Sequence, residues 1–180
     1  MQVPAELLEA LRRDQRVHVR KLLTRTPLDL NEAEVICDGY GIDDPDAIPL
    51  LFWAIQSGVT VEALALLIEH GLDLTQTSRE GLGAIDIAIK NRRRDVVEMC
   101  DQAGISLTTT QRRSGVTPLM LAASFGDVAM VDFLLGKGAS IDDTDKRGTD
   151  AIEYARILGQ TKMVEYLTEK KGSQKEKQGV

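Results

Sequence analysis

Two stretches of this chain resemble each other at a fixed offset, and this repetition restricts the folds open to the sequence more than any other feature. The first stretch begins at Gly115 and the second at Gly148, 33 positions later. The first reads Gly-Val-Thr-Pro-Leu-Met-Leu-Ala-Ala-Ser-Phe-Gly, and the second reads Gly-Thr-Asp-Ala-Ile-Glu-Tyr-Ala with a further glycine at Gly159. About 33 residues suffice for a turn and two helices, and such units stack on their neighbours. The sequence therefore predicts a repeat protein.

The residue order within the first stretch predicts where its two helices begin and end. Thr117 can cap a helix through its hydroxyl, and Pro118 suits the first helical position, where no amide hydrogen is needed. Gly126 and Gly138 each tolerate the left-handed backbone that closes a helix. Apolar residues recur at spacings of three and four over 128–135, which indicates one buried stripe on the second helix. Neither helix can bury its apolar side alone, so neighbouring units must cover it.

The motif Gly-x-Thr-Pro-Leu…Ala-Ala…Gly…Val…Leu-Leu…Gly-Ala that starts at Gly115 resembles the ankyrin repeat, with Met120 where that family usually has histidine. Counting from Ala122 finds weaker copies around Ala88, Ala54 and Ala10. The resemblance implies an all-α fold, an ankyrin-repeat solenoid of about five helix-turn-helix units with β-turn fingers. We expect units at about 4–31 (an N-terminal cap), 47–77, 78–111, 112–144 and 145–170 (a C-terminal cap), together one domain over 1–170.

Two segments fall outside these units. Residues 32–46 form an acidic insertion, which we expect to be an extended loop. It is either solvated, or a second contact surface or lid over the N-terminal end of the binding groove, for which Tyr40 would be the natural anchor. The last ten residues, 171–180, contain almost no apolar side chain, and we expect them to be disordered.

Composition narrows the classes of function. The 180 residues carry a formal charge of −6 with a pI near 5.0, which argues against a general nucleic-acid binder. Glu6 and Glu9 lie where a signal peptide would be apolar, and the longest apolar run, 48–55, is too short to span a bilayer. Cys37 and Cys100 show no disulfide pattern and predict two free thiols. We therefore expect a cytoplasmic protein, or a nuclear one if the host has a nucleus, with no membrane partner.

The chain offers no convincing catalytic set. Its two histidines, His18 and His70, lie far apart in the sequence and suit helix surfaces and ends. The segment 142–148 resembles a calcium loop only briefly, because Arg147 and Tyr154 stand where acidic ligands belong. We expect no enzyme activity, no cofactor and no metal site.

The ankyrin resemblance implies binding on the concave side, at the tips of the turns and at exposed positions of the first helices. Carried over position by position, these sites are rich in cations and include apolar anchors. The predicted contact residues are Arg79, Glu80, Leu82, Lys90, Asn91, Arg112, Arg113, Ser124, Phe125, Lys146, Arg147 and Ile157, with Tyr40 from the insertion. An equally weighted alternative is that the tips are merely solvated. Arg92, Arg93 and Arg94 are expected on a solvated face, or alternatively as an extension of the basic patch.

The leading hypothesis is a non-catalytic protein–protein interaction module, for example an adaptor, that is monomeric by itself. Its partner would be a protein or extended peptide with an acidic, partly apolar face, because cations and an aromatic residue line the predicted site. One alternative is an inhibitor or immunity-type protein that occludes a partner enzyme or toxin. Another is a purely structural scaffold.

Overall fold

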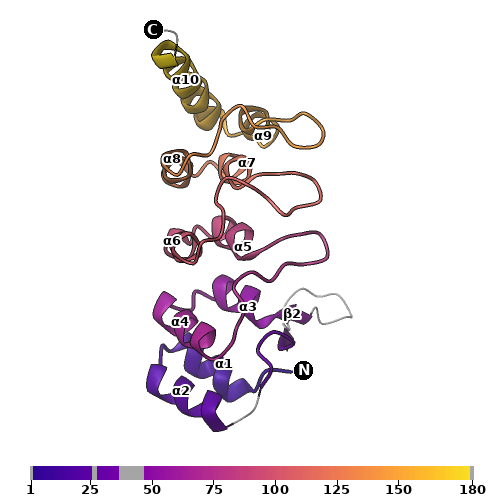
Figure 1. Ribbon diagram of the computed structural model, residues 1–180, viewed down its shortest axis with the longest axis vertical. Helices are drawn as coiled ribbons and strands as arrows, with labels where there is room; N and C mark the ends of the chain where they lie inside the picture. Colours follow the sequence, from indigo (N-terminus) through magenta and orange to yellow (C-terminus); the bar gives the residue numbers. More distant parts are fainter. Residues whose placement is uncertain (1, 26–27, 37–46, 179–180) are drawn as a thin grey trace. The chain divides into compact units, whose positions relative to one another are not determined.

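The computed structural model describes residues 2–25, 28–36 and 47–178, with side chains described as far as Ser173 (Figure 1). The described residues form ten helices and two short strands, so the predicted all-α repeat fold is confirmed. The chain divides into two compact units, residues 1–76 and 77–180.

The first unit contains two helix pairs. They are α1 (Ala5–Arg12) with α2 (Arg16–Arg25), and α3 (Leu50–Gln56) with α4 (Val61–Glu69). Leu11, Leu50 and Leu64 are almost completely buried, because each helix turns its apolar side toward the others. The Thr60 hydroxyl donates a hydrogen bond to Asp14 Oδ1 (2.7 Å) and accepts one from the amide of Ala63. It therefore caps α4 and ties it to the turn between α1 and α2.

A two-stranded sheet replaces part of the predicted insertion loop. Strand β1 (Glu34–Ile36) pairs antiparallel with β2 (Ala47–Pro49), with Val35 opposite Ile48. Val35 is buried, and the amide of Val3 donates to the Glu34 carbonyl at 3.1 Å. The prediction of a loop over 32–46 is therefore wrong for 34–36, where a β-branched side chain can be buried in extended backbone. Residues 37–46, including Tyr40, lie outside the described part of the chain.

The second unit consists of three helix pairs in two layers. The first helices are α5 (Ala84–Lys90), α7 (Pro118–Ser124) and α9 (Ala151–Ile157), and the second helices are α6 (Arg94–Gln102), α8 (Val128–Gly136) and α10 (Thr161–Gln178). Helix α7 packs between α5 and α9 (Figure 1). Each first helix is thus covered by its successor, as the repeat pattern predicts.

The predicted caps are present, with chain-specific variations. The Thr117 hydroxyl accepts from the amide of Met120 (3.3 Å), while the sulfur of Met120 accepts from the amide of Thr117 (3.4 Å). Met120, at the position where the family usually has histidine, therefore provides a side-chain acceptor for the amide of Thr117. Helix α5 begins at Gly83, which has no side-chain oxygen, and there the carboxylate of Asp86 accepts the Gly83 amide at 2.8 Å.

The C-terminal tail is more ordered than its composition suggests. Disorder was predicted from residue 171, but α10 continues to Gln178. Lysine, glutamate and glutamine are good helix formers, and extending an existing helix avoids the nucleation penalty. Lys171 also pairs with Asp142 (2.7 Å) and lies 3.7 Å from Asp150, which anchors the start of this extension.

The thiol of Cys100 provides a test of the packing of α6. Cys100 is fully buried, and burial raises the pKa of its thiol to about 12. In a Cys37→Ser variant, we expect Cys100 to react with Ellman's reagent only after unfolding in urea, because the reactive thiolate is suppressed in the folded state. Rapid labelling of the folded protein at about pH 8 would contradict this packing.

Candidate partner-binding surface

Three β-turn fingers precede α5, α7 and α9 and project to the same side of these helices (Figure 1). Each finger closes with an amide that donates three residues back to a carbonyl. These bonds join Gly81 to Ser78 (2.9 Å), Gly115 to Arg112 (3.0 Å) and Gly148 to Asp145 (3.0 Å). All three glycines have φ near +80°, a conformation that side chains other than glycine rarely adopt. The fingers therefore share one backbone geometry.

Backbone hydrogen bonds also join one finger to the next. The Arg113 amide donates to the Glu80 carbonyl (3.0 Å), and the Lys146 amide donates to the Ser114 carbonyl (3.1 Å). At Gly81 an added Cβ would collide with the carbonyl of Gln111. The three tips are therefore held in a fixed row.

Side chains inside the fingers support this geometry. Both carboxylate oxygens of Asp145 are used: one accepts from the amides of Arg147 (2.8 Å) and Thr149 (2.9 Å), and the other from the Tyr154 hydroxyl (2.8 Å). These hydrogen bonds, that of the Thr149 amide first, hold the pKa of Asp145 below its ordinary value. In the first finger of this unit the Ser78 hydroxyl accepts from the amides of Glu80 and Leu82. The segment that resembled a calcium loop is thus a hydrogen-bonded turn.

Arg112 has a structural role at the base of the middle finger. Its Nε donates to Asp86 Oδ1 at 2.7 Å, and the two side chains are only 17% and 10% exposed. The same carboxylate caps α5 through Gly83. Arg112 was predicted to contact a partner, but its guanidinium is instead committed to joining the middle finger to the preceding helix pair.

The cations at the tips are Arg79, Arg113, Lys146 and Arg147, called here the tip cations; all four are exposed. In the described part of the chain, none of these side chains forms an ion pair or a side-chain hydrogen bond. Glu80, also exposed, follows Arg79 directly. The net charge of these residues is therefore about zero at the first finger, where Arg79 and Glu80 cancel. It is positive at the middle finger and at the last, where the carboxylate of Asp145 offsets one of the adjacent cations Lys146 and Arg147.

The ends of the first helices differ from one repeat to the next. Lys90 and Asn91 are exposed at the end of α5, whereas Ile157 (65% exposed) and Leu158 (54%) lie at the end of α9. Apolar side chains with such exposure are typical of partner-binding positions when they cluster. Leu158 shares this position but was not among the predicted contact residues.

At the end of α7, the predicted residues are less accessible. Ser124 was predicted to be exposed, but it is only 5% exposed and its hydroxyl donates to the Leu121 carbonyl at 2.7 Å. A small side chain next to a first-helix alanine turns into the stack, which spacing alone did not reveal. Phe125 and Leu82 are half-buried.

The three consecutive arginines at the start of α6 do not extend the row of tip cations. Arg93 pairs with Asp95 (2.8 Å), and Arg94 pairs with Glu98 (2.8 Å) and lies 4.7 Å from the ring centre of Phe133. Arg92 donates to the Phe125 carbonyl at 3.4 Å. Their charges are thus used within the chain, which leaves the tip cations as a separate set.

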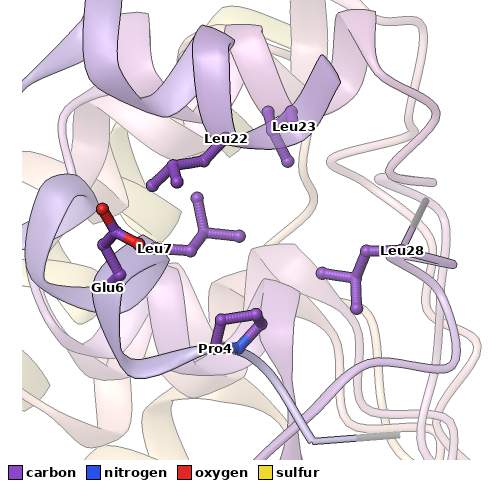
Figure 2. Close-up of a pocket in the computed structure, with 6 residues that line it drawn as sticks. All are labelled: Pro4, Glu6, Leu7, Leu22, Leu23 and Leu28. Carbon is purple, nitrogen blue, oxygen red and sulfur yellow. The ribbon is translucent and has the colours of Figure 1, made fainter. Parts of the chain in front are cut away.

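A second, smaller feature lies in the first unit. Pro4, Leu7, Leu22 and Leu28 point toward a common cavity of about 50 Å³, with Glu6 and Leu23 completing its lining (Figure 2).

The described residues contain no group of three metal-ligating side chains. His18 contacts Glu6 at 3.1 Å, and His70 Nδ1 contacts the Leu66 carbonyl at 2.8 Å, so each imidazole is engaged locally. Within the described ranges, no helix has the length and apolar character needed to cross a membrane.

Comparison with known proteins shows where similar sequences occur. Residues 99–178 match the family model of Ankyrin repeats (3 copies). The chain is 29% identical over 167 residues to the nuclear factor NF-kappa-B p105 subunit of Gallus gallus, covering 84% of this chain and 17% of that protein. It is 31% identical over 128 residues to the ankyrin repeat protein nuc-2 of Neurospora crassa, covering 71% of this chain and 12% of that protein. An L-asparaginase of Dirofilaria immitis is 29% identical over 110 residues, with 61% of this chain and 18% of that protein covered. The chain spans less than a fifth of each of these relatives.

The ion pair between Arg112 and Asp86 predicts a large effect on stability. Arg112→Met leaves a buried carboxylate without its cation, and we expect the free energy of unfolding to fall by about 3 kcal/mol. In an Asp86→Asn background, where the amide oxygen can still cap α5, the same change should cost less than about 1 kcal/mol. Urea unfolding of the four chains measures this coupling, and equal costs in both backgrounds would disprove it.

The lowered pKa of Asp145 predicts a dependence of stability on acid. The folded state favours the carboxylate, so its contribution is present above the ordinary pKa of 3.8 and is lost as the pH falls through the lower folded value. We expect the unfolding free energy of Asp145→Asn to fall less than that of the parent as the pH drops below about 4. Denaturant unfolding over a pH series tests this, and parallel curves for the two chains would contradict it.

Proposed function

This chain is an ankyrin repeat protein, and we propose that it acts as a non-catalytic binding module that recognises an acidic, partly apolar protein partner through the fingers and first-helix ends of residues 77–180. Ankyrin repeats are protein–protein interaction modules that present extended surfaces to their partners. The partner's chemistry is inferred from the side chains that these elements expose.

The tip cations carry the proposal. The chain has a formal charge of −6, yet four exposed cations without an ion-pair partner in the described residues lie on one row of tips. By contrast, Arg93 and Arg94 at the start of α6 are paired with Asp95 and Glu98. Exposed cations on one row of an acidic protein attract the acidic groups of a partner and accelerate association.

Apolar anchors accompany this charge. Ile157 and Leu158 are exposed at the end of α9, and Phe125 is half-exposed at the equivalent position of α7. Burial of such side chains provides most of the affinity in typical interfaces, while rim charges affect mainly rate and specificity. A partner that combines acidic and apolar groups would use both.

Some relatives are named as enzymes, but our proposal does not assign their activities to this chain. The L-asparaginase of Dirofilaria immitis and the palmitoyltransferase AKR1 of Lachancea kluyveri match it over only 18% and 16% of their own lengths. We propose binding without catalysis, in the cytoplasm or, in a host with a nucleus, in the nucleus.

A charge-reversal variant tests the surface. We expect Arg113→Glu combined with Phe125→Ala to abolish recovery of the partner in a tagged pull-down from host lysate, because the change reverses the central tip charge and removes an anchor. Release of the partner from the parent chain by high salt would support the electrostatic contribution.

Lys162→Glu serves as the matched control, because Lys162 is an exposed cation on the second helix α10. This variant makes the same change of charge away from the fingers and should retain the partner. Equal recovery by the parent and by the Arg113→Glu/Phe125→Ala variant would show that the partner binds elsewhere.

A further inference from the structure

The spacing of the tip cations carries information about the partner's conformation. Arg79, Arg113 and Lys146 each lie two residues before the finger glycine, so they occupy the same place in three successive fingers. The fingers are joined by the backbone bonds from Arg113 to Glu80 and from Lys146 to Ser114. The cations therefore recur at the spacing of the stacked first helices, about 8–10 Å for packed helices.

We propose that the tips bind an extended acidic segment in polyproline II conformation, with an acidic side chain at every third residue. This inference rests on the proposed function and specifies the partner of the same surface. In polyproline II, three residues complete one turn and advance about 9.3 Å, so every third side chain lies on the same side. That advance matches the finger spacing.

Other regular conformations match less well. In a β-strand, residues two apart lie on the same face at a distance of about 6.7 Å, and residues four apart at about 13 Å. Neither distance equals the spacing of the fingers. An α-helix places residues seven apart on one side at about 10.5 Å, and its diameter of about 10–12 Å keeps its axis away from the tips. A polyproline II segment also needs little ordering on binding, and repulsion between its acidic side chains keeps it extended.

The charges at the three fingers determine how much each acidic residue of the segment contributes to binding. At the first finger Glu80 opposes Arg79. The middle finger presents Arg113, and the last presents Lys146 and Arg147 next to the carboxylate of Asp145. Arg112 adds nothing here because it is bound to Asp86. Acidic residues facing the last two fingers therefore contribute most of the binding, and the one facing Glu80 contributes least.

The apolar positions at the end of α9 lie on the same repeat as the two adjacent tip cations. Ile157 and Leu158 belong to the repeat whose finger carries Lys146 and Arg147. A partner whose acidic segment ends at this finger can continue onto these side chains. This coincidence explains why a partner would be both acidic and partly apolar.

Three synthetic probes of equal charge test the register, with the full chain as receptor. The matched probe repeats Glu-Pro-Ser three times, which places glutamate at the first, fourth and seventh positions. The second has the same composition with glutamate at the first, third and fifth positions. The third is an alanine-rich helical peptide with three glutamates spaced seven residues apart. Fluorescence anisotropy with a neutral dye, at low and high salt, gives the dissociation constants.

We expect the matched probe to bind about tenfold more tightly than either alternative, because its repeat of about 9.3 Å agrees best with the spacing of the tips. Arg113→Gln and Lys146→Gln should remove this preference, whereas Lys162→Gln should leave it unchanged. Glu80→Gln should tighten the matched probe by about two- to threefold, because it frees the charge of Arg79. Circular dichroism and urea unfolding of each variant check that these exposed substitutions leave the fold intact.

Equal binding of the three probes would show that charge alone matters and would overturn the register, and tightest binding of the helical probe would overturn the extended conformation. Either result leaves the proposed function standing if the native partner still depends on Arg113 and Phe125. Probe binding that is insensitive to the tip variants also overturns the inference. If the native partner is insensitive as well, the proposed function fails with it.

Discussion

The close stacking of the first helices is the constraint on which the second unit depends. Ala88, Ala122 and Ala155 recur at repeat spacing in α5, α7 and α9, and all three are 0% exposed. A small side chain at this position lets adjacent helices approach, and the layer of second helices then closes over them. Because each helix is too short to be stable in water alone, its apolar side must be covered by its neighbours. The fingers project from this stack, so their spacing is inherited from it.

The polar side chains that support the finger differ from one repeat to the next. The last finger is organised by Asp145 and Tyr154, the first finger of the second unit by Ser78, and the middle finger by the pairing of Arg112 with Asp86. Every buried amide and carboxylate in a turn needs a hydrogen-bond partner. In each of the three fingers, different side chains provide these partners. The turn geometry is shared even though the side chains that support it are not.

Few cations remain for a partner at the fingers, because several others form contacts within the chain. Arg112, which was predicted near the tips, is bound to Asp86. Arg92, Arg93 and Arg94, which were expected on a solvated face, are engaged at the start of α6 and the end of α7. The remaining tip cations have no structural task in the described residues, which makes them available to a partner. In a fold whose backbone repeats, specificity depends on which side chains are left uncommitted.

The sequence by itself determined the repeat architecture, the positions of the helices and the caps, because the 33-residue period and the order of threonine, proline, alanine and glycine act locally. It also located the tip cations, since position within a finger follows from distance to its glycine. Only the tertiary structure decided that Arg112 is an internal ion-pair partner, that Ser124 turns into the stack, and that 34–36 pairs with 47–49 as a sheet. It also showed that the tail continues α10, where Lys171 meets Asp142 and Asp150. These features depend on residues distant in the sequence, whose encounter no local pattern specifies.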